Sequence, residues 1–418
     1  MQSNNPIKAD IIFGLYFFVM ICLYTYTYVQ LAAQMLIILY VLSPFVKTKL
    51  KTTKLLIKKS SFDEAKSFVA WYGAFALLLF VSKRWAYSSL NGSKTMLTVF
   101  RIFVICFFLI IHCSTKDRIL GVFKSFAIAF FCASVIVLLT TPISQWGLAG
   151  QEEGFGAVIG QHRNGLGAIS AALALLVYSF DRRFSFRLGK LMAGYFVGFT
   201  LITGSRGSIL QIVIILTIHM LFNQKNLTRK AKNFFWLVAI SLILIPVFQA
   251  VPFLYSIVWS RVEGALYTIL GKSAIDTSTL GRQYYKMLAL QMFLQRPILG
   301  YGLDGFVCYL RDHPVIMGTY IRAVYAHCNY AEIGADLGIV GLIVWYLPIL
   351  KNIFHIMKKR TISRWNSCVV ATFFSIVILD YSRIPWETHM SMYLIVIVLL
   401  LLHRCLDEES KPSGELSS

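Results

Sequence analysis

Side chains that could bind anions or move protons gather in four short segments of an otherwise apolar chain. Three of these segments are residues 161–164, 204–208 and 327–332, and the fourth surrounds Arg282. An arginine guanidinium binds phosphate oxygens through paired hydrogen bonds. A neutral histidine is the usual base for removing a proton from a hydroxyl group. These residue types therefore indicate anion binding combined with general-base chemistry.

Arg206 occupies a turn of glycine and serine residues, G-S-R-G-S, between two apolar runs. The small neighbours allow backbone N–H groups to approach a ligand closely, and the turn begins a helix whose N-terminal dipole favours an anion. We therefore expect Arg206 to bind phosphate oxygens. The alternative is an arginine that snorkels to the lipid headgroups without binding a substrate.

Arg282 lies in the first turn of a helix predicted for residues 280–295, for which residues 277–279 offer an N-cap. A cation there opposes the helix dipole unless an anion lies beside it. Arg282 is therefore a second candidate for binding phosphate, and a solvated arginine on an amphipathic helix is the alternative. Tyr285 on the same helix is a candidate for stacking on a sugar ring, or for anchoring the helix at the membrane interface.

His327 begins an apolar run, and Asn329 and Glu332 follow it closely as candidates for substrate binding. We expect the imidazole of His327 to act as the base for a hydroxyl. Glu332 lies about 140° around a helix from His327, so it would orient the imidazole only if the first turn is irregular. A structural histidine at a helix start is the alternative. His162 and Arg163 open another run and admit the same two interpretations.

Motifs for nucleotide or metal binding are missing from the sequence. It contains no Walker-type phosphate loop, no H-x-x-x-H or C-x-x-C spacing and no D-x-D pair. No metal ion or other cofactor is therefore implied. Arg101 and Lys124 lie inside or near apolar runs, where a charge is costly and normally faces a polar cavity or snorkels. They leave a transporter without covalent chemistry open as a further class.

The composition predicts a membrane protein. Of the 418 residues, 57% are hydrophobic and 14% are charged, and the mean hydropathy is +0.67, whereas soluble domains carry about 25% charged residues. The net charge of +21 is spread over short basic clusters between apolar runs, as in cytoplasmic loops that obey the positive-inside rule. We therefore expect membrane lipids as partners, and no nucleic acid.

The apolar runs predict an all-α, polytopic fold with about twelve transmembrane helices, because a span needs about 20 mainly apolar residues. Six lysines within residues 47–59 place that loop and both termini in the cytoplasm. Later basic loops agree, except for the one with Lys83, Arg84 and Lys94, and all four polar segments then share the outer face. The predicted spans cover residues 10–29, 31–46, 67–82, 95–113, 119–140, 164–180, 190–203, 207–222, 234–252, 328–350, 366–381 and 390–403.

The predicted organisation has four parts. Residues 1–251 hold the first nine spans, residues 252–326 form an extracytoplasmic loop with short helices, residues 327–405 hold the last three spans, and residues 406–418 form a cytoplasmic tail. No cleavage site follows the first apolar run, so we expect it to remain as an anchor.

The eight cysteines give little guidance. Five of them lie in apolar stretches, where cysteine behaves as a small hydrophobic residue. Cys308 and Cys328 share a predicted outer segment, so they either form a disulfide or remain thiols.

Three motifs within residues 160–350 occur in a recognisable order. They are the turn T-G-S-R-G-S, a G-R pair followed by P-I-L-G-Y-G, and H-C-N-Y-A-E-I-G-A-D-L-G-I-V-G. Together they resemble the O-antigen ligase and polymerase family of bacterial membrane glycosyltransferases. The resemblance implies a similar number of spans, a large periplasmic loop late in the chain and an outward-facing site.

The resemblance also implies roles for individual residues. It implies His327 as the catalytic base, with Arg206 and Arg282 as ligands of a lipid diphosphate. His162 and Arg163 match the family more loosely. Many members have H-N where Cys328 intervenes here, which leaves the role of Asn329 open.

The implied reaction moves a glycan from undecaprenyl diphosphate to an acceptor hydroxyl, with inversion, at the periplasmic face of the inner membrane. Arginines neutralise the leaving group, so the reaction is expected to be metal-independent. The acceptor is another lipid-linked repeat unit in an O-antigen polymerase, or lipid A-core in an O-antigen ligase of lipopolysaccharide biosynthesis. A chain-length regulator protein is a further candidate partner, and a lipid-linked glycan transporter is the third alternative.

Overall fold

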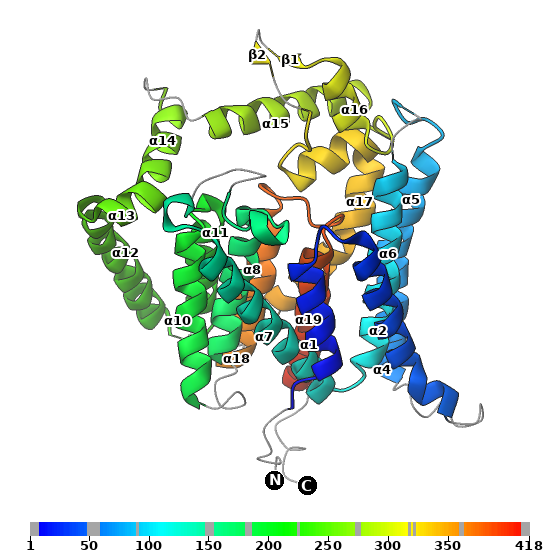
Figure 1. Cartoon of the computed structure of the whole chain (residues 1–418), viewed down its shortest axis with the longest axis horizontal. Helices are drawn as coiled ribbons and strands as arrows, with labels where there is room; N and C mark the ends of the chain where they lie inside the picture. The colour runs from blue at the N-terminus through cyan, green and yellow to red at the C-terminus, as the bar shows by residue number, and fades with distance from the viewer. Residues whose placement is uncertain are drawn as a thin grey trace.

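In the computed structural model the regular elements of the described residues are helices, apart from one antiparallel pair of two-residue strands (Figure 1). The described residues are 8–47, 59–88, 92–146, 154–179, 186–223, 226–271, 277–316, 319–320, 323–358 and 363–410. Of the predicted tail at 406–418, residues 406–410 continue helix α19 and residues 411–418 lie outside the described ranges. The all-α prediction is therefore confirmed for the part of the chain that the structure describes.

Each of the predicted spans overlaps a helix. These helices are α1 (Ile11–Cys22), α2 (Thr27–Lys47), α4 (Lys59–Phe68) continued by η2 (Val69–Gly73) and α5 (Ala74–Ser82), α6 (Ser93–His112), α7 (Lys116–Thr140), α8 (Arg163–Ser179), α10 (Phe186–Ile202), α11 (Arg206–Asn223), α12 (Leu227–Ala250), α17 (Asn329–Met357), α18 (Arg364–Leu379) and α19 (His389–Ser410). Six of them are long and apolar enough to cross a membrane. The chain is a membrane protein, and the total of twelve spans stays a prediction.

The first helix is shorter than its apolar run. The run was predicted to stay helical to residue 29, but α1 ends at Cys22 and the chain turns before α2 begins. The side-chain amide of Gln30 donates to the backbone carbonyls of Leu23 and Tyr24 at 3.3 and 2.6 Å. These bonds satisfy carbonyl groups that the end of α1 leaves without helical partners, and so they stabilise the turn.

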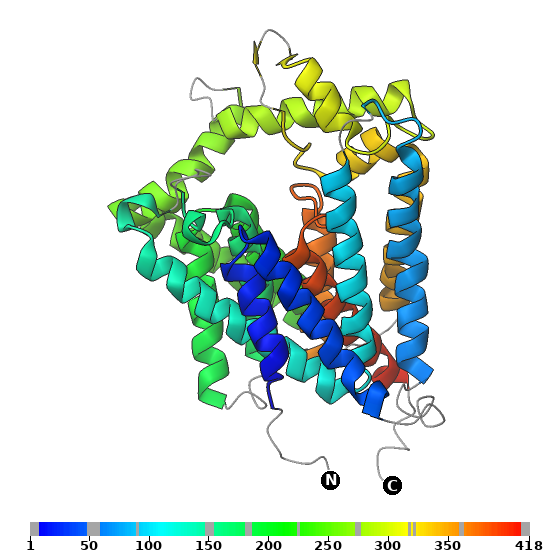
Figure 2. The ribbon, with the colours of Figure 1, turned by 45° about the vertical axis from the view of Figure 1, so that its right-hand side comes forward.

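Residues 252–320 form a series of short elements at one end of the bundle. They are α13 (Pro252–Leu254), η5 (Tyr255–Trp259), α14 (Ser260–Ile269), α15 (Thr277–Gln295), α16 (Gly305–Asp312), β1 (Val315–Ile316) and β2 (Thr319–Tyr320). Figures 1 and 2 both show α15 lying across the end of the bundle opposite to that where α1 begins and α19 ends. We call the former the α15 end and the latter the terminal end.

Helix α17 is broken at Gly338, which has φ 62° and ψ −157°. The break divides α17 into a first part, residues 329–337, and a second part, residues 339–357, and Figure 1 shows the upper portion of α17 turning away from the rest. A break inside an apolar helix leaves backbone N–H and C=O groups without helical partners, and each such group is expensive to bury in a membrane. Other backbone groups must therefore bond to them.

The segment 297–302 supplies those partners. The N–H groups of Tyr301 and Gly302 donate to the carbonyls of Ala335 and Asp336 at 2.9 and 2.7 Å. In the other direction, the N–H groups of residues 339 and 340 donate to the carbonyls of residues 297 and 298 at 2.8 and 3.3 Å. The P-I-L-G-Y-G and D-L-G motifs are thus adjacent in space and hydrogen-bonded to each other.

The basic loop that departed from the positive-inside pattern packs on this same segment. Trp85 Nε1 donates to the carbonyl of Leu299 at 3.1 Å, and the N–H of Tyr87 donates to the carbonyl of Tyr301 at 2.7 Å. The connection between α5 and α6 therefore lies at the α15 end, where its backbone and rings cover the docked segment.

Aromatic rings form the centre of the bundle. The ring of Trp345 on α17 lies 4.7 Å from that of Phe75 and 5.1 Å from that of Trp71. Trp71 Nε1 donates to the carbonyl of Trp345 at 2.9 Å, and the hydroxyl of Tyr72 donates to the carbonyl of Trp386 at 2.7 Å. These bonds join η2 to α17 and to the loop after α18.

We predict that Gly338→Ala destabilises the protein, because a side chain at positive φ costs about 1–3 kcal/mol and the added methyl would overlap the carbonyl of Ile298. The matched control is Gly194→Ala in α10, where an added methyl meets no atom within 4 Å. Thermal unfolding of the detergent-purified protein should show a midpoint several degrees lower for Gly338→Ala only. Equal midpoints for the two variants would contradict the docked break.

Candidate active site

His327 lies two residues before α17, in a backbone conformation that few side chains adopt. Its φ is 53°, so the residue is in the left-handed region, which costs about 1–3 kcal/mol for a residue other than glycine. The carboxylate of Glu332 accepts a hydrogen bond from the N–H of Ala326, the residue before His327. Glu332 thus contacts the backbone next to His327, and through that bond it fixes where the imidazole lies.

Two tyrosines contact the imidazole of His327. The ring of Tyr325 lies 4.1 Å away at an angle of 50°, and the ring of Tyr285 on α15 lies 5.6 Å away at 37°. The His327 side chain is half-buried between them. The sequence had indicated Tyr285 as a candidate for sugar stacking, and the structure places it beside the candidate base.

Positive charge surrounds His327. Burial first, and then the charges of Arg282, His162 and Lys286, together lower the pKa of His327 to about 3. The imidazole is therefore neutral at physiological pH. Arg282 and Lys286 are one turn apart on α15, so this helix directs two cations towards the histidine.

His162 belongs to the same cluster. Burial lowers the pKa of His162, and the neighbouring charges of Arg163 and Arg282 add to that effect. Its Nδ1 accepts the backbone N–H of Asn164 at 3.2 Å. Since Arg282 acts on both histidines, the structure brings together His162, Arg282 and His327 from three distant parts of the sequence.

Arg163 and Arg206 lie on either side of one turn. Arg163 is 8% exposed, and its Nη1 donates to the carbonyls of Thr203 and Gly204 at 3.4 Å. Arg206 is the first residue of α11, and its Nη1 donates to the carbonyl of Arg261 in α14 at 2.9 Å. Arg206 is not among the charges that lower the pKa of His327. Arg163 supports the turn that carries Arg206.

Asn329 takes part in a buried network rather than facing the cluster. Its backbone N–H donates to the carbonyl of Asp380 at 2.7 Å, and its side-chain Nδ2 donates to the Tyr346 hydroxyl at 2.8 Å and to Asp380 Oδ2 at 3.0 Å. The Tyr346 hydroxyl donates to the same Asp380 oxygen at 2.9 Å. The side chain of Asn329 is fully buried, so it positions the start of α17.

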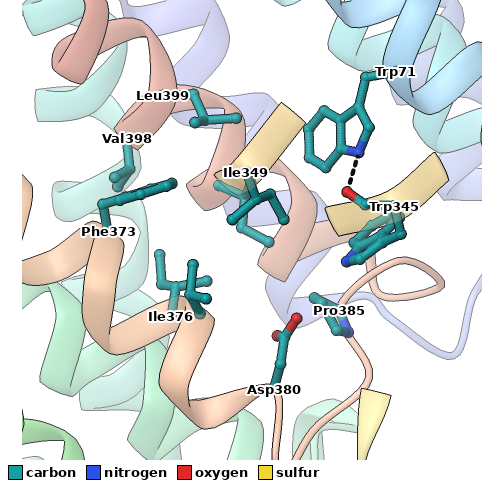
Figure 3. A pocket seen from close by; sticks show the side chains of 11 residues that line it. Trp71, Trp345, Ile349, Phe373, Ile376, Asp380, Pro385, Val398 and Leu399 are labelled. Carbon is teal, nitrogen blue, oxygen red and sulfur yellow. Dashed lines mark hydrogen bonds between the residues drawn. The ribbon is translucent and has the colours of Figure 1, made fainter. Parts of the chain in front are cut away.

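Asp380 also borders a small cavity. Figure 3 shows its carboxylate at the end of α18 pointing into a pocket between Trp345, Ile349 and Pro385. The cavity measures about 20 Å³, which is enough for one water molecule. This pocket is mainly apolar in its lining, so it serves packing rather than substrate binding.

Sequence analysis missed the loop between α18 and α19, residues 380–388. Lys286 Nζ lies 3.2 Å from the centre of the Tyr381 ring, and Arg383 Nη2 donates to Gln211 Oε1 in α11 at 2.6 Å. Burial lowers the pKa of Arg383 to about 10, although nearby Asp380 opposes the shift. Burial and the charge of Asp304 raise the pKa of Glu387 to about 7.

This loop carried a signal in its composition. The run D-Y-S-R-I-P-W-E-T-H places two acids, an arginine and a histidine between two apolar spans. Its density of charge matches that of the four segments that were recognised, and by the predicted topology it lies on the same face. Its contacts with α15 and α11 now place it in the wall of the site.

The two cysteines near the site are buried free thiols, so Cys308 and Cys328 do not form a disulfide in this structure. Within the described ranges, no group of three or more histidine, cysteine, aspartate or glutamate side chains is arranged to hold a metal ion.

A helical membrane protein with a cationic, aromatic-lined site at one end is the class that the fold and the cluster define. Residues 191–346 match the model of a protein family described as O-antigen ligase. This match supports, for that part of the chain, the resemblance to the O-antigen ligase and polymerase family that the motifs predicted. The matched segment includes Arg206, Arg282 and His327, whereas His162 and Asp380 lie outside it. A comparison with curated proteins found no match.

We predict that the neutral form of His327 persists in acid. For a histidine with an ordinary pKa near 6.5, the neutral fraction falls about thirtyfold between pH 7.5 and pH 5. For His327, with a pKa of about 3, the neutral fraction should hardly change. Diethyl pyrocarbonate modifies neutral imidazoles, so mass-spectrometric mapping at both pH values measures this. Arg282→Gln should raise the pKa of His327 and reduce its modification at pH 5. A thirtyfold loss in the wild-type protein would refute the cationic cluster.

Asp380→Ala is expected to destabilise the start of α17, because it leaves the donors of Asn329 and Tyr346 buried without this acceptor. Each unsatisfied buried group costs about 1–3 kcal/mol. Hydrogen exchange of peptides that cover residues 325–337 should become faster in Asp380→Ala. Asp380→Asn, which keeps a carbonyl acceptor, should show a smaller change, and identical exchange in both variants would count against the network.

Proposed function

We propose that the chain is a glycosyltransferase that moves a glycan from a polyprenyl diphosphate to an acceptor hydroxyl. The observation that carries this proposal is the meeting of His327, Arg282 and His162 with Tyr285 and Tyr325. A neutral base, a guanidinium and aromatic rings are the groups that a hydroxyl, a diphosphate and a sugar ring require.

In the proposed reaction, the acceptor oxygen attacks the anomeric carbon of the donor glycan. The bond between that carbon and the diphosphate oxygen breaks, and undecaprenyl diphosphate leaves with the bonding electrons. Arg282 and Arg206 stabilise the charge that develops on the leaving oxygens. The proton of the acceptor hydroxyl passes to the imidazole of His327. Attack opposite to the leaving group inverts the anomeric configuration, and the arginines provide the charge stabilisation that a metal supplies in other enzymes.

Donor binding would also prepare the base. In the free protein Arg282 is one of the charges that keep the pKa of His327 low, which makes the imidazole a weak proton acceptor. A diphosphate bound to Arg282 would neutralise that charge and bring its own negative charge close, so the pKa of His327 would rise. Proton removal is thereby favoured once the donor is in place.

We propose that the terminal end faces the cytoplasm of the bacterial inner membrane and that the site faces the periplasm. The described basic residues Lys116, Arg118, Lys230 and Lys358 lie at or near helix ends on the terminal side, as the positive-inside rule requires of a cytoplasmic face. Residues 252–326 would then be the extracytoplasmic loop, and the described ends of the chain would be cytoplasmic.

The first candidate for the specific reaction is that of an O-antigen polymerase, whose acceptor is another lipid-linked repeat unit. The second candidate is an O-antigen ligase, whose acceptor is lipid A-core, and the description of the matching family model favours it. Both reactions use the same donor, so His327 and the two arginines would serve either one. A chain-length regulator protein is a proposed partner of the polymerase alone.

We predict that His327→Ala abolishes product formation and that Arg282→Gln and Arg206→Gln weaken donor use. The measurement is the surface glycan of a deletion strain that carries each variant. Lipid A-core capped with a single repeat would identify a lost polymerase, and long lipid-linked chains that never reach the core would identify a lost ligase. Lys94→Gln, which removes an exposed charge at the start of α6, is the control. Wild-type glycan in the His327→Ala strain would favour a transporter instead.

A further inference from the structure

A second cationic site lies in the bundle, formed by Arg101 on α6 and two glutamines on α2. Arg101 Nε donates to Gln34 Oε1 at 2.8 Å, and Arg101 Nη2 donates to Gln30 Oε1 at 2.9 Å. Both glutamines are 4% exposed. Their side chains therefore hold the guanidinium in one orientation within an apolar span.

The charge of this guanidinium is not balanced. In the part of the chain that the structure describes, the ion pairs join His112 to Asp10, Arg311 to Asp312 and Arg404 to Glu64, and none involves Arg101. A charge inside a span is costly and normally has a partner of opposite sign or serves a substrate. Two neutral amides orient Arg101 without neutralising it, so the site can still accept an anion.

Further polar groups border the same place. Gln34 Nε2 and His389 Nε2 are buried and make no hydrogen bond of ordinary geometry within the described chain, although the Gln34 amide lies beside the hydroxyls of Tyr16 and Tyr393. The side-chain oxygen of Gln34 accepts from Arg101, and His389 at the start of α19 is close enough to feel the charge of Arg101. A group that satisfies the guanidinium and the amide N–H must be an acceptor, and an anion satisfies both the hydrogen bonds and the charge.

The position of the Arg101 guanidinium along its helix indicates which kind of anion can reach it. It bonds to Gln30, which lies in the first turn of α2, at the α15 end of that helix. Arg101 is the ninth residue of α6, which begins at Ser93 at the α15 end, so the guanidinium lies about 12 Å below the outer end of that helix, in the outer half of the span. The neighbouring side chains of Phe100 on α6 and Met35 on α2 are 60% and 66% exposed, so this face of the helix pair borders lipid. A lipid phosphate can therefore approach Arg101 from the membrane.

We propose that Arg101, held in place by Gln30 and Gln34, binds the phosphate of the acceptor lipid, as a second site beside that of the donor. This inference rests on the proposed transferase function. Both candidate acceptors are lipids that carry phosphate, the diphosphate of a lipid-linked repeat or the phosphate groups of lipid A. Holding that phosphate at Arg101 leaves the sugar hydroxyl of the acceptor to reach His327.

The test is the number of lipids that the full-length protein binds, counted by native mass spectrometry after release from detergent, with undecaprenyl diphosphate as the probe. We expect two bound lipids for the wild type and one for Arg101→Gln. Gln34→Glu is the sharper variant, because it keeps the shape of the side chain and supplies an internal carboxylate that neutralises Arg101. It should weaken the second binding event roughly ten- to hundredfold, the loss expected for a charge-assisted hydrogen bond. Lys94→Gln, which removes an exposed charge from the same helix, should still bind two.

The outcomes separate this inference from the proposed function. Loss of one lipid in Arg101→Gln and of the other in Arg282→Gln supports both. Two bound lipids with unchanged affinity in Gln34→Glu would overturn the inference. If Arg282→Gln alone then lost one lipid, the proposed donor site would still be supported. Competition decides the source of the phosphate. Displacement of the second lipid by lipid A supports the ligase acceptor, resistance to it supports the repeat-unit acceptor, and equal displacement by phosphatidylglycerol overturns the acceptor assignment.

Discussion

The break in α17 is the constraint on which the arrangement of the site depends. A helix interrupted inside a membrane must find hydrogen-bond partners for its freed backbone groups, since water is not available there. Residues 297–302 provide these partners on both sides of Gly338. Because α15 ends at Gln295 and His327 lies two residues before α17, the same bonds set the end of one element against the start of the other. The docking of two backbones thereby determines how the cations of α15 lie relative to the imidazole.

The acidic and basic side chains around His327 have different partners. The acids accept hydrogen bonds that hold the start of α17, and the cations lie near the imidazole. Glu332 accepts from the N–H of Ala326, and Asp380 accepts from Asn329 and Tyr346. These carboxylates are therefore used in shaping the start of α17. Arg282 and Lys286 instead act on the histidine. An anion bound beside Arg282 would therefore raise the pKa of His327, so in the proposed reaction donor binding and proton removal would be linked.

Much of this fold could be predicted from apolar periodicity and loop charge, because the membrane selects long apolar helices so strongly. The helix at residues 280–295 was found from its cap and its proline, and it begins three residues earlier, at Thr277. The break at Gly338 was not predicted, since a glycine in an apolar run has no distinct signal until its distant partner is known. The contact of Asn329 with Asp380 spans 51 residues, so no local sequence pattern could predict it. The sequence therefore indicated Asn329 only as a binding candidate.

Three arginines share a mode of support that would suit the proposed binding of phosphate. Arg163 and Arg206 donate to backbone carbonyls, and Arg101 donates to glutamine oxygens. Neutral acceptors fix the direction of a guanidinium but leave its positive charge available, whereas a carboxylate would compete with the phosphate for the same hydrogen bonds. The price is a buried positive charge in the free protein. A phosphate bound at Arg101, as proposed, would remove part of this unfavourable energy, so binding of the lipid would stabilise the fold.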